Sequence, residues 1–190
     1  MNENDTATRF RRLAARFATV VESVPADRWD APSPCEGWTV ADVVDHVATT
    51  EREFLERMEL PTGAPADPGA SGPDAAVAAW RASSAAMQAV VDDPAIVGRT
   101  YDGYFGPTTI GETIDTFYAS DLVVHAWDIA RGAGLTELEQ LPPEDLDRIQ
   151  SQMAVAGDTV RMPGVYGPEV EVPNDASAQD RFLAWTGRRP

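Results

Sequence analysis

The sequence predicts an all-α protein: a four-helix bundle with an additional C-terminal helix and an extended tail. Apolar residues recur at helical spacing in four long segments, and proline or glycine punctuates the ends of these segments. The connections between the segments are short, as in bundles whose neighbouring helices are antiparallel. A chain of 190 residues is long enough for one domain with a hydrophobic core, so we expect residues 1–190 to form a single domain.

The first helix is predicted over residues 5–24. Phe10, Leu13 and Phe17 belong to an apolar face that repeats at helical spacing, and Pro25 ends the segment because proline does not continue a helix. The opposite face carries arginines, which we interpret as solvent-exposed: Arg9, Arg12 and Arg16. We therefore expect these arginines to form a solvated face rather than an anion-binding site.

The second helix is predicted over residues 39–59 and carries the first candidate site residues. Thr39 is the expected N-cap, with Asp42 as a weaker capping-box partner than Glu or Gln. The apolar stripe of the helix consists of Val40, Val43, Val44, Val47, Phe54 and Met58. His46 lies at the edge of this stripe. Glu51 lies near its centre, which is an unusual position for a carboxylate.

The remaining elements are predicted from the same signals. A Pro/Gly-rich connector, which we interpret as a plain loop rather than a lid, precedes an alanine-rich helix and an irregular loop or short hairpin. A fourth long helix ends at the glycines of RGAG, a fifth helix follows LPPED, and a short helix lies near the C-terminus. The connector is expected over residues 60–73, the alanine-rich helix over 74–91 and the loop or hairpin over 94–108. The fourth long helix is expected over 110–131, the fifth from after LPPED to about 161, and the short helix over 176–185.

The fourth helix holds three polar residues inside its apolar stripe. At about 100° per residue, Asp121, His125 and Asp128 fall on the same face as Ile114 and Val124. Asp121 and His125 are spaced i and i+4, so their side chains are neighbours. Burying polar groups in such a stripe costs free energy unless they have partners. The sequence therefore points to a site on this face.

A divalent metal ion is one partner that accounts for these residues. His46, Asp121 and His125 supply two imidazoles and a carboxylate from two helices and leave coordination positions open, which is the pattern of catalytic zinc or non-haem iron. The alternative is a buried hydrogen bond between a histidine and an aspartate, with His46 unrelated to it. Because the D-x-x-x-H spacing often occurs by chance, the residues alone leave the two interpretations level.

The composition limits the classes of partner and of chemistry. The chain has 31 acidic and 15 basic residues, a net charge of −16, whereas nucleic acids and anionic membranes require clustered positive charge. We expect neither as a partner and interpret the acidity as solubility. All the basic residues are arginine. The absence of lysine excludes a Schiff-base lysine and a Walker lysine, and with them PLP enzymes and P-loop NTPases.

Several features favour a cytoplasmic location. The polar start MNENDTATRFRR contains no apolar region typical of a signal peptide, and no apolar run approaches the ~18 residues of a membrane span. The single cysteine, Cys35, cannot form an intramolecular disulfide, which fits a reducing compartment. We therefore expect a cytoplasmic protein.

Cys35 is the competing candidate for an active-site residue. It lies shortly before the second helix, and a helix N-terminus lowers the pKa of a thiol, whereas the neighbouring Glu36 acts in the opposite direction. No histidine is close to it in the sequence, so we interpret Cys35 as structural. The aromatic residues are interpreted as packing or covering groups: Trp38 and Trp127 near the site, and Tyr101, Tyr104 and Phe105 over the core.

Three segments carry a resemblance to a known family. SPCEGWTVADVVDHVATTEREF resembles the second-helix signature of the DinB-like superfamily, and is most similar to the N-terminal metal-binding domain of mycothiol-dependent maleylpyruvate isomerase. DLVVHAWDIARGAG resembles the matching fourth-helix signature. The tail YGPEVEVPNDASAQDRFLAWTGRRP is similar to the end of a compact subgroup of that family. The resemblance covers nearly the whole chain and implies a DinB-like bundle with a divalent metal at one end.

The resemblance also implies a set of ligands. Matched residue by residue, they are His46, Asp121 and His125, with Asp128 and Glu51 as surrounding groups that orient a histidine or accept a proton. The isomerase has glutamate in place of Asp121, and because aspartate is shorter, Asp121 binds the ion directly or through water. Zinc is the expected metal, with nickel or iron as alternatives. The isomerase's C-terminal domain has no counterpart here, which removes much of the basis for assigning its substrate.

The function implied is that of a metal-dependent thiol transferase or isomerase. The metal would bind a low-molecular-weight thiol such as mycothiol and stabilise its thiolate, which would attack an electrophile. The alternatives are a non-catalytic metal-binding bundle that acts in sensing or protein interaction, and an interaction module without metal. The expected partners are a small-molecule thiol and an electrophile. The oligomeric state is left open, with a homodimer as one option.

Overall fold

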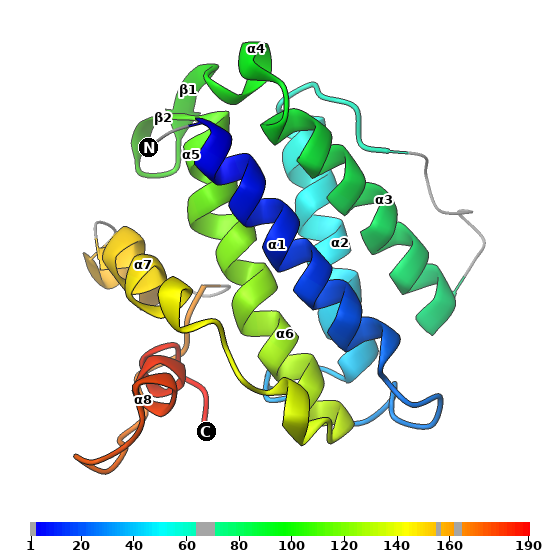
Figure 1. Cartoon of the computed structure of the whole chain (residues 1–190), viewed down its shortest axis with the longest axis vertical. Helices are drawn as coiled ribbons and strands as arrows, with labels where there is room; N and C mark the ends of the chain where they lie inside the picture. Colours follow the sequence, from blue (N-terminus) through cyan, green and yellow to red (C-terminus); the bar gives the residue numbers. More distant parts are fainter. Residues whose placement is uncertain (1–2, 64–70, 155–156, 162–164) are drawn as a thin grey trace.

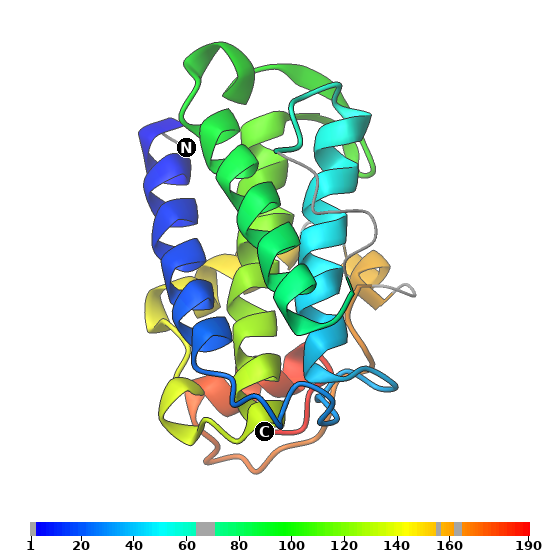
Figure 2. The same ribbon diagram turned by 90° about the vertical axis from the view of Figure 1, so that its right-hand side faces the viewer.

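The computed structural model describes residues 3–63, 71–154, 157–161 and 165–190. Four long helices form an upright bundle (Figures 1 and 2): α1 (Glu3–Glu22), α2 (Val40–Arg57), α3 (Pro73–Val91) and a fourth whose main part is α6 (Ala119–Ala133). Neighbouring helices follow the order α1, α3, α2, α6 around the bundle. The all-α fold class is therefore confirmed, and the two helices with the predicted site residues, α2 and α6, are neighbours.

The apolar stripes of the four helices meet in one core. Its fully buried side chains include Phe10, Leu13, Phe17, Val44, Leu55, Met87, Ile114, Leu122, Trp127 and Ile129. Each such side chain contributes roughly 1.5–3 kcal/mol of transfer free energy. At the start of α2 the expected capping box is present, because Thr39 Oγ1 accepts from the Asp42 amide and the Asp42 carboxylate accepts from the Thr39 amide. The cap and the core together fix where α2 presents its site residues.

The fourth long helix departs from the single α-helix that the sequence predicts. It begins as α5 (Ile110–Thr113), continues through a π-helical turn, η1 (Ile114–Tyr118), and then becomes α6. In the π turn the Ala119 amide donates to the Ile114 carbonyl, five residues back. Gly134, in the left-handed conformation with φ 77°, ends α6, as the glycine signal predicts.

The π turn changes which residues before α6 face the core. Asp115 is 1% exposed. Phe117, which a regular α-helix would place on the same face as Asp121, is only partly buried and stacks on Phe105. One extra residue in the turn rotates the preceding faces relative to α6. Asp121, His125 and Asp128 all lie within α6, so their common face is unaffected.

One arginine of the predicted solvent-exposed face of α1 is buried instead. Arg9 is 4% exposed, and it donates to Asp145 at 2.7 Å and to Asp115 at 2.9 Å. Arg12, which is exposed as predicted, also pairs with Asp145 at 2.8 Å. Asp145 belongs to α7 (Pro143–Ala154), which packs beside the bundle (Figure 1). Arg9 was misassigned because its carboxylate partners are more than a hundred residues away in the sequence.

Short elements cover one end of the bundle. α4 (Pro94–Val97) leads into a hairpin of β1 (Thr100–Gly103) and β2 (Gly106–Thr109), in which Thr100 pairs with Thr109. The predicted loop or short hairpin is therefore a hairpin. At its turn, Tyr104 is 70% and Phe105 is 45% exposed, whereas Tyr101 is partly buried. Of these aromatic residues, Tyr101 comes closest to the predicted covering role.

The C-terminal third packs on one side of the bundle (Figure 1) and ends in α8 (Ala178–Trp185). η2 (Thr136–Leu138) precedes α7, and η3 (Gly157–Arg161) is a 3-10 helix. The predicted fifth helix is thus too long, because α7 ends at Ala154. The central part of the predicted connector, residues 64–70, lies outside the described residues. None of the described helices combines the length and apolarity that a membrane span requires.

Candidate metal centre

Three side chains from α2 and α6 converge at the predicted site. Ligand atoms of His46, Asp121 and His125 all lie within 4.8 Å of one another. The two imidazole rings meet edge to face, with their centroids 5.1 Å apart. His125 is 7% exposed, whereas His46 and Asp121 are only partly buried. The cluster is therefore enclosed around His125 and reaches solvent beside the other two side chains.

This set of donor atoms fits a divalent cation. Ligands at ~2.1 Å from a tetrahedral Zn²⁺ lie roughly 3.4 Å from one another. The three donors, all within 4.8 Å, would need to approach one another by about 1.4 Å at most. Side-chain rotation is sufficient for a change of this size. Two imidazoles and one carboxylate also leave at least one coordination position for water or a substrate.

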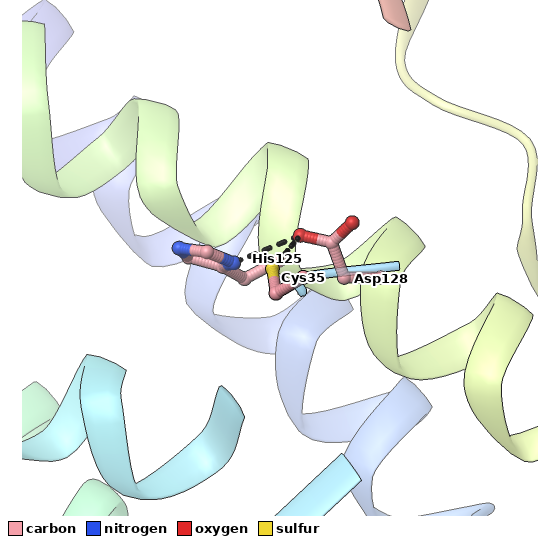
Figure 3. A group of neighbouring side chains, drawn as sticks. All are labelled: Cys35, His125 and Asp128. Atoms are coloured by element: carbon pink, nitrogen blue, oxygen red, sulfur yellow. Dashed lines mark hydrogen bonds and ion pairs between the residues drawn. The ribbon is translucent and has the colours of Figure 1, made fainter. Parts of the chain in front are cut away.

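Asp128 fixes the orientation of His125 (Figure 3). Its Oδ2 lies 2.9 Å from His125 Nδ1, and its side chain is fully buried. Burial alone would raise the pKa of Asp128, but the charge of Arg188 and the hydrogen bond and charge of His125 lower it to about 2. An ionised carboxylate only accepts hydrogen bonds. His125 Nδ1 is therefore the donor, and Nε2 is the nitrogen left for a metal ion.

The pKa values of the two histidines are shifted in opposite directions. Burial lowers the pKa of His46 to about 4, and the positive charge of His125 adds to this effect. Burial also acts to lower the pKa of His125, but hydrogen bonds with Asp128 and Cys35 and the nearby carboxylate charges raise it to about 10. Burial raises the pKa of Asp121. At neutral pH the His46 imidazole is thus neutral, whereas His125 would have to lose a proton before it could bind a metal.

A tight loop before α2 places two further side chains near the site. Pro32 and Thr39 form an isolated β-bridge, and the Trp38 amide donates to the Cys35 carbonyl at 3.0 Å. Gly132 of α6 allows the loop to come close, because a Cβ atom there would lie only 3.1 Å from the Pro32 carbonyl oxygen. The loop is therefore held directly against the helix that carries His125.

The loop before α2 brings the side chains of Cys35 and Trp38 into contact with residues of the site. The Cys35 thiol lies 3.3 Å from Asp128 Oδ2, the oxygen that accepts from His125 (Figure 3). The Trp38 ring lies 4.7 Å from the His46 ring and 6.5 Å from the His125 ring, centroid to centroid. Trp38 is therefore next to the site, as the sequence predicts. The structural role of Cys35 stays a prediction, although its thiol is much closer to a histidine than sequence distance suggests.

Arg188 is the site residue that the sequence analysis missed. It donates to Asp128 from Nη2 at 2.9 Å and from Nε at 3.2 Å, so it engages both carboxylate oxygens. Its side chain is 10% exposed. Arg188 lies beyond the last predicted helix and 60 residues from Asp128. No periodicity links the two positions, and the only local signal is the glycine–arginine pair that follows the helix.

Glu51, which lies near the centre of the apolar stripe of α2, is buried. Its side chain is 1% exposed, and Ser83 of α3 donates to its Oε2 at 2.6 Å. Burial raises the pKa of Glu51 to about 8, and the charge of nearby Asp121 adds to this effect. The hydrogen bond described for Glu51 goes to Ser83 and not to a histidine. Of the two expected surrounding groups, only Asp128 therefore contacts a proposed ligand through a described hydrogen bond.

Comparison with protein families identifies the family to which this chain belongs. The family model of the mycothiol maleylpyruvate isomerase N-terminal domain matches residues 10–130. That match spans more than half of the chain, and the chain belongs to this family. The family is a mycothiol-related, metal-binding one. The matched range contains His46, Asp121, His125 and Asp128, but ends well before Arg188.

The chain is also similar to uncharacterized mycobacterial proteins. The chain is 28% identical over 180 residues to uncharacterized proteins of Mycobacterium tuberculosis strains CDC 1551 and H37Rv, and the match covers 94% of this chain and 94% of theirs. A second uncharacterized protein in strain H37Rv is 28% identical over 134 residues, which cover 61% of this chain and 51% of that protein. No solved structure matches the chain.

Proposed function

We propose that this protein is a divalent-metal-dependent enzyme that acts on a low-molecular-weight thiol, as a thiol transferase or isomerase. The observation that supports this most is the convergence of His46, Asp121 and His125 within 4.8 Å, with Asp128 holding His125 by its Nδ1. Membership of a mycothiol-related family supports a thiol as the small-molecule partner. Mycothiol itself, the electrophile and a homodimeric state remain predictions.

Each residue of the site has a defined task in this proposal. His46, Asp121 and His125 hold the ion, and zinc is the metal that this donor set favours, with nickel or iron as alternatives. A divalent ion here supplies Lewis acidity, which stabilises the thiolate form of a small-molecule thiol at neutral pH. Asp128 keeps the His125 ring in the tautomer and orientation that present Nε2.

Glu51 is proposed as the proton-exchanging group beside the site. A carboxyl group with a pKa of about 8 is mostly protonated at neutral pH and exchanges its proton readily there. Ser83 holds one of its oxygens, whereas Oε1 has no hydrogen-bond partner among the described residues. In its protonated form Glu51 can therefore donate a proton from Oε1 to a substrate atom, and in its ionised form the same oxygen can accept a proton from a thiol.

Metal content tests the ligand set. The untagged protein, purified after metal supplementation, is expected to contain about one divalent ion per chain, and His125→Ala is expected to lose most of it. Asp121→Asn should lower the content, whereas Asp121→Glu should retain it. Asp45→Asn is the matched control, because Asp45 is an exposed carboxylate on α2 next to His46. Metal-free wild type would refute the site, and equal content in wild type and Asp121→Asn would exclude Asp121 as a direct ligand.

Thiol conjugation tests catalysis. The metal-loaded protein is expected to accelerate the reaction of mycothiol or a related small thiol with an electrophile, and His46→Ala or removal of the ion should abolish the acceleration. A protein that holds its metal but turns over no thiol–electrophile pair would instead support the alternative function, a non-catalytic metal-binding bundle.

A further inference from the structure

Helix α8 ends in a turn that fixes the backbone of Arg188. Gly187 adopts the left-handed conformation with φ 87°, its amide donates to the Ala184 carbonyl, and the Arg188 amide donates to the Leu183 carbonyl. These two bonds define a Schellman motif. A Cβ atom on Gly187 would also lie 2.8 Å from the Gly167 Cα atom. The position after the helix is therefore tightly determined by glycine.

Contacts that do not involve Arg188 anchor this helix. Phe182 and Leu183 are fully buried, and the buried Thr186 hydroxyl donates to the Leu183 carbonyl at 2.7 Å. Arg161 donates to the carbonyls of Gly167 and Trp185, both at 2.6 Å. These contacts hold the terminal segment against the bundle, so its fold does not depend on the ion pair between Arg188 and Asp128.

The Arg188 side chain completes the surroundings of Asp128. The guanidinium meets both oxygens of a carboxylate that is fully buried, in the two-point geometry that arginine forms with carboxylates. Asp128 Oδ2 also accepts from His125 Nδ1. Without Arg188, this carboxylate would keep its histidine partner but lose the contact that holds its plane and balances its charge.

We propose that Arg188 is a positioning residue of the metal centre, which acts through Asp128 to hold His125 as a ligand. The inference rests on the proposed function, since it assumes that His125 binds a metal. It also makes the C-terminal segment part of the centre, although the family match ends at residue 130. α8 and its terminal turn place the Arg188 side chain beside a site whose proposed ligands lie on α2 and α6.

Titration of the untagged, metal-free full chain with Co²⁺, followed by its visible absorption, tests the proposal. Arg188→Met keeps most of the side-chain length without the charge, and Arg188→Lys restores the charge without the two-point contact. Arg189→Met is the matched control, because Arg189 is the exposed neighbour with the same charge. Asp128→Asn and the double variant with Arg188→Met complete a double-mutant cycle, and circular dichroism verifies the fold of each variant.

Arg188→Met is expected to weaken Co²⁺ binding by about 10- to 100-fold, the usual effect of losing a group that supports a ligand. Arg188→Lys should weaken Co²⁺ binding less than Arg188→Met does, and Arg189→Met should bind Co²⁺ with the affinity of wild type. In the Asp128→Asn background, Arg188→Met should change the affinity less than about threefold, because its route to His125 is gone.

Three results would overturn the inference. Wild-type affinity in a folded Arg188→Met variant, an equal loss in the Arg189→Met control, or an undiminished loss in the Asp128→Asn background would each contradict it. The failure of wild type to bind Co²⁺ would refute the metal centre itself, and the inference with it, so the two failures are distinguishable.

Discussion

Metal binding by this protein is expected to release a proton from His125, with a large effect on affinity. In the metal-free protein the pKa of His125 is raised to about 10, so the ring is an imidazolium at pH 7. Because pH 7 lies about 3 units below this pKa and each unit corresponds to 1.36 kcal/mol, removing the proton at pH 7 costs about 4 kcal/mol. The affinity at pH 7 is therefore expected to be about a thousandfold below its value when His125 is neutral.

The sign of the pH dependence follows from the raised pKa. Below pH 10 the proton and the metal ion compete for Nε2 of His125, so affinity should rise about tenfold per pH unit through the neutral range. His46, with a pKa of about 4, is neutral throughout this range and adds no dependence. A histidine with an ordinary pKa of about 6.5 would produce a curve that flattens above about pH 7.5.

Isothermal titration calorimetry in pairs of buffers with different ionisation enthalpies counts the released protons. A water molecule on the ion ionises near neutral pH as well, so the comparison with Asp128→Asn is decisive. That variant removes the carboxylate charge that helps to raise the His125 pKa, and an amide oxygen accepts a weaker hydrogen bond from Nδ1 than a carboxylate does. At pH 8.5, wild type should release close to one proton more than Asp128→Asn. Equal proton counts in the two proteins would refute the reasoning.

Three further predictions concern stability and the thiol. Glu51→Gln should raise the free energy of unfolding by about 3 kcal/mol at pH 7, because folding raises the pKa of Glu51 from 4.5 to about 8 and therefore costs free energy that grows from pH 4.5 up to pH 8. Urea unfolding should show a larger stabilisation by this substitution at pH 8 than at pH 5. An equal stabilisation at the two pH values would contradict the prediction. Gly132→Ala should lower stability by about 1–3 kcal/mol in thermal unfolding, since its Cβ would crowd Pro32, and an unchanged Tm would show that the loop moves freely. Cys35→Ser should retain both the metal and any thiol-transfer activity, and lost turnover with metal and fold intact would make Cys35 the nucleophile.

The sequence was most informative where the relevant contacts are local. Asp121, His125 and Asp128 lie one helical turn apart, so their common face follows from helix geometry alone and survives in the structure. The place of Glu51 near the centre of its apolar stripe follows from helix geometry in the same way, and its side chain is buried. That the face of α6 would meet His46 on α2 followed from the apolar stripes and from the family resemblance, since the two helices are far apart in the sequence.

The features that sequence reasoning missed depend on distant contacts or on irregular backbone. The π turn over Ile114–Tyr118 has no composition signal, and it moved Asp115 into the core beside Arg9. Arg188 reaches Asp128 only because α8 docks beside the bundle, and no pattern within the tail specifies that docking. Burial of a charged residue is recognisable from sequence when its partner is a helical turn away, but not when the partner is on another element.

Charge balance links the arrangement of the site to the kind of ligand it would accept. In the metal-free protein, the charge of Asp128 is paired with Arg188 and the protonated His125, and burial raises the pKa of the neighbouring Asp121. Binding a divalent ion with loss of the His125 proton adds one net positive charge. Uncompensated charge in an enclosed site is costly, and an anion in the open coordination position restores the balance. A thiolate and a metal-bound hydroxide both carry that charge, whereas a neutral thiol or water does not, so the proposed centre would favour an anionic ligand, of which the thiolate of the proposed substrate is one.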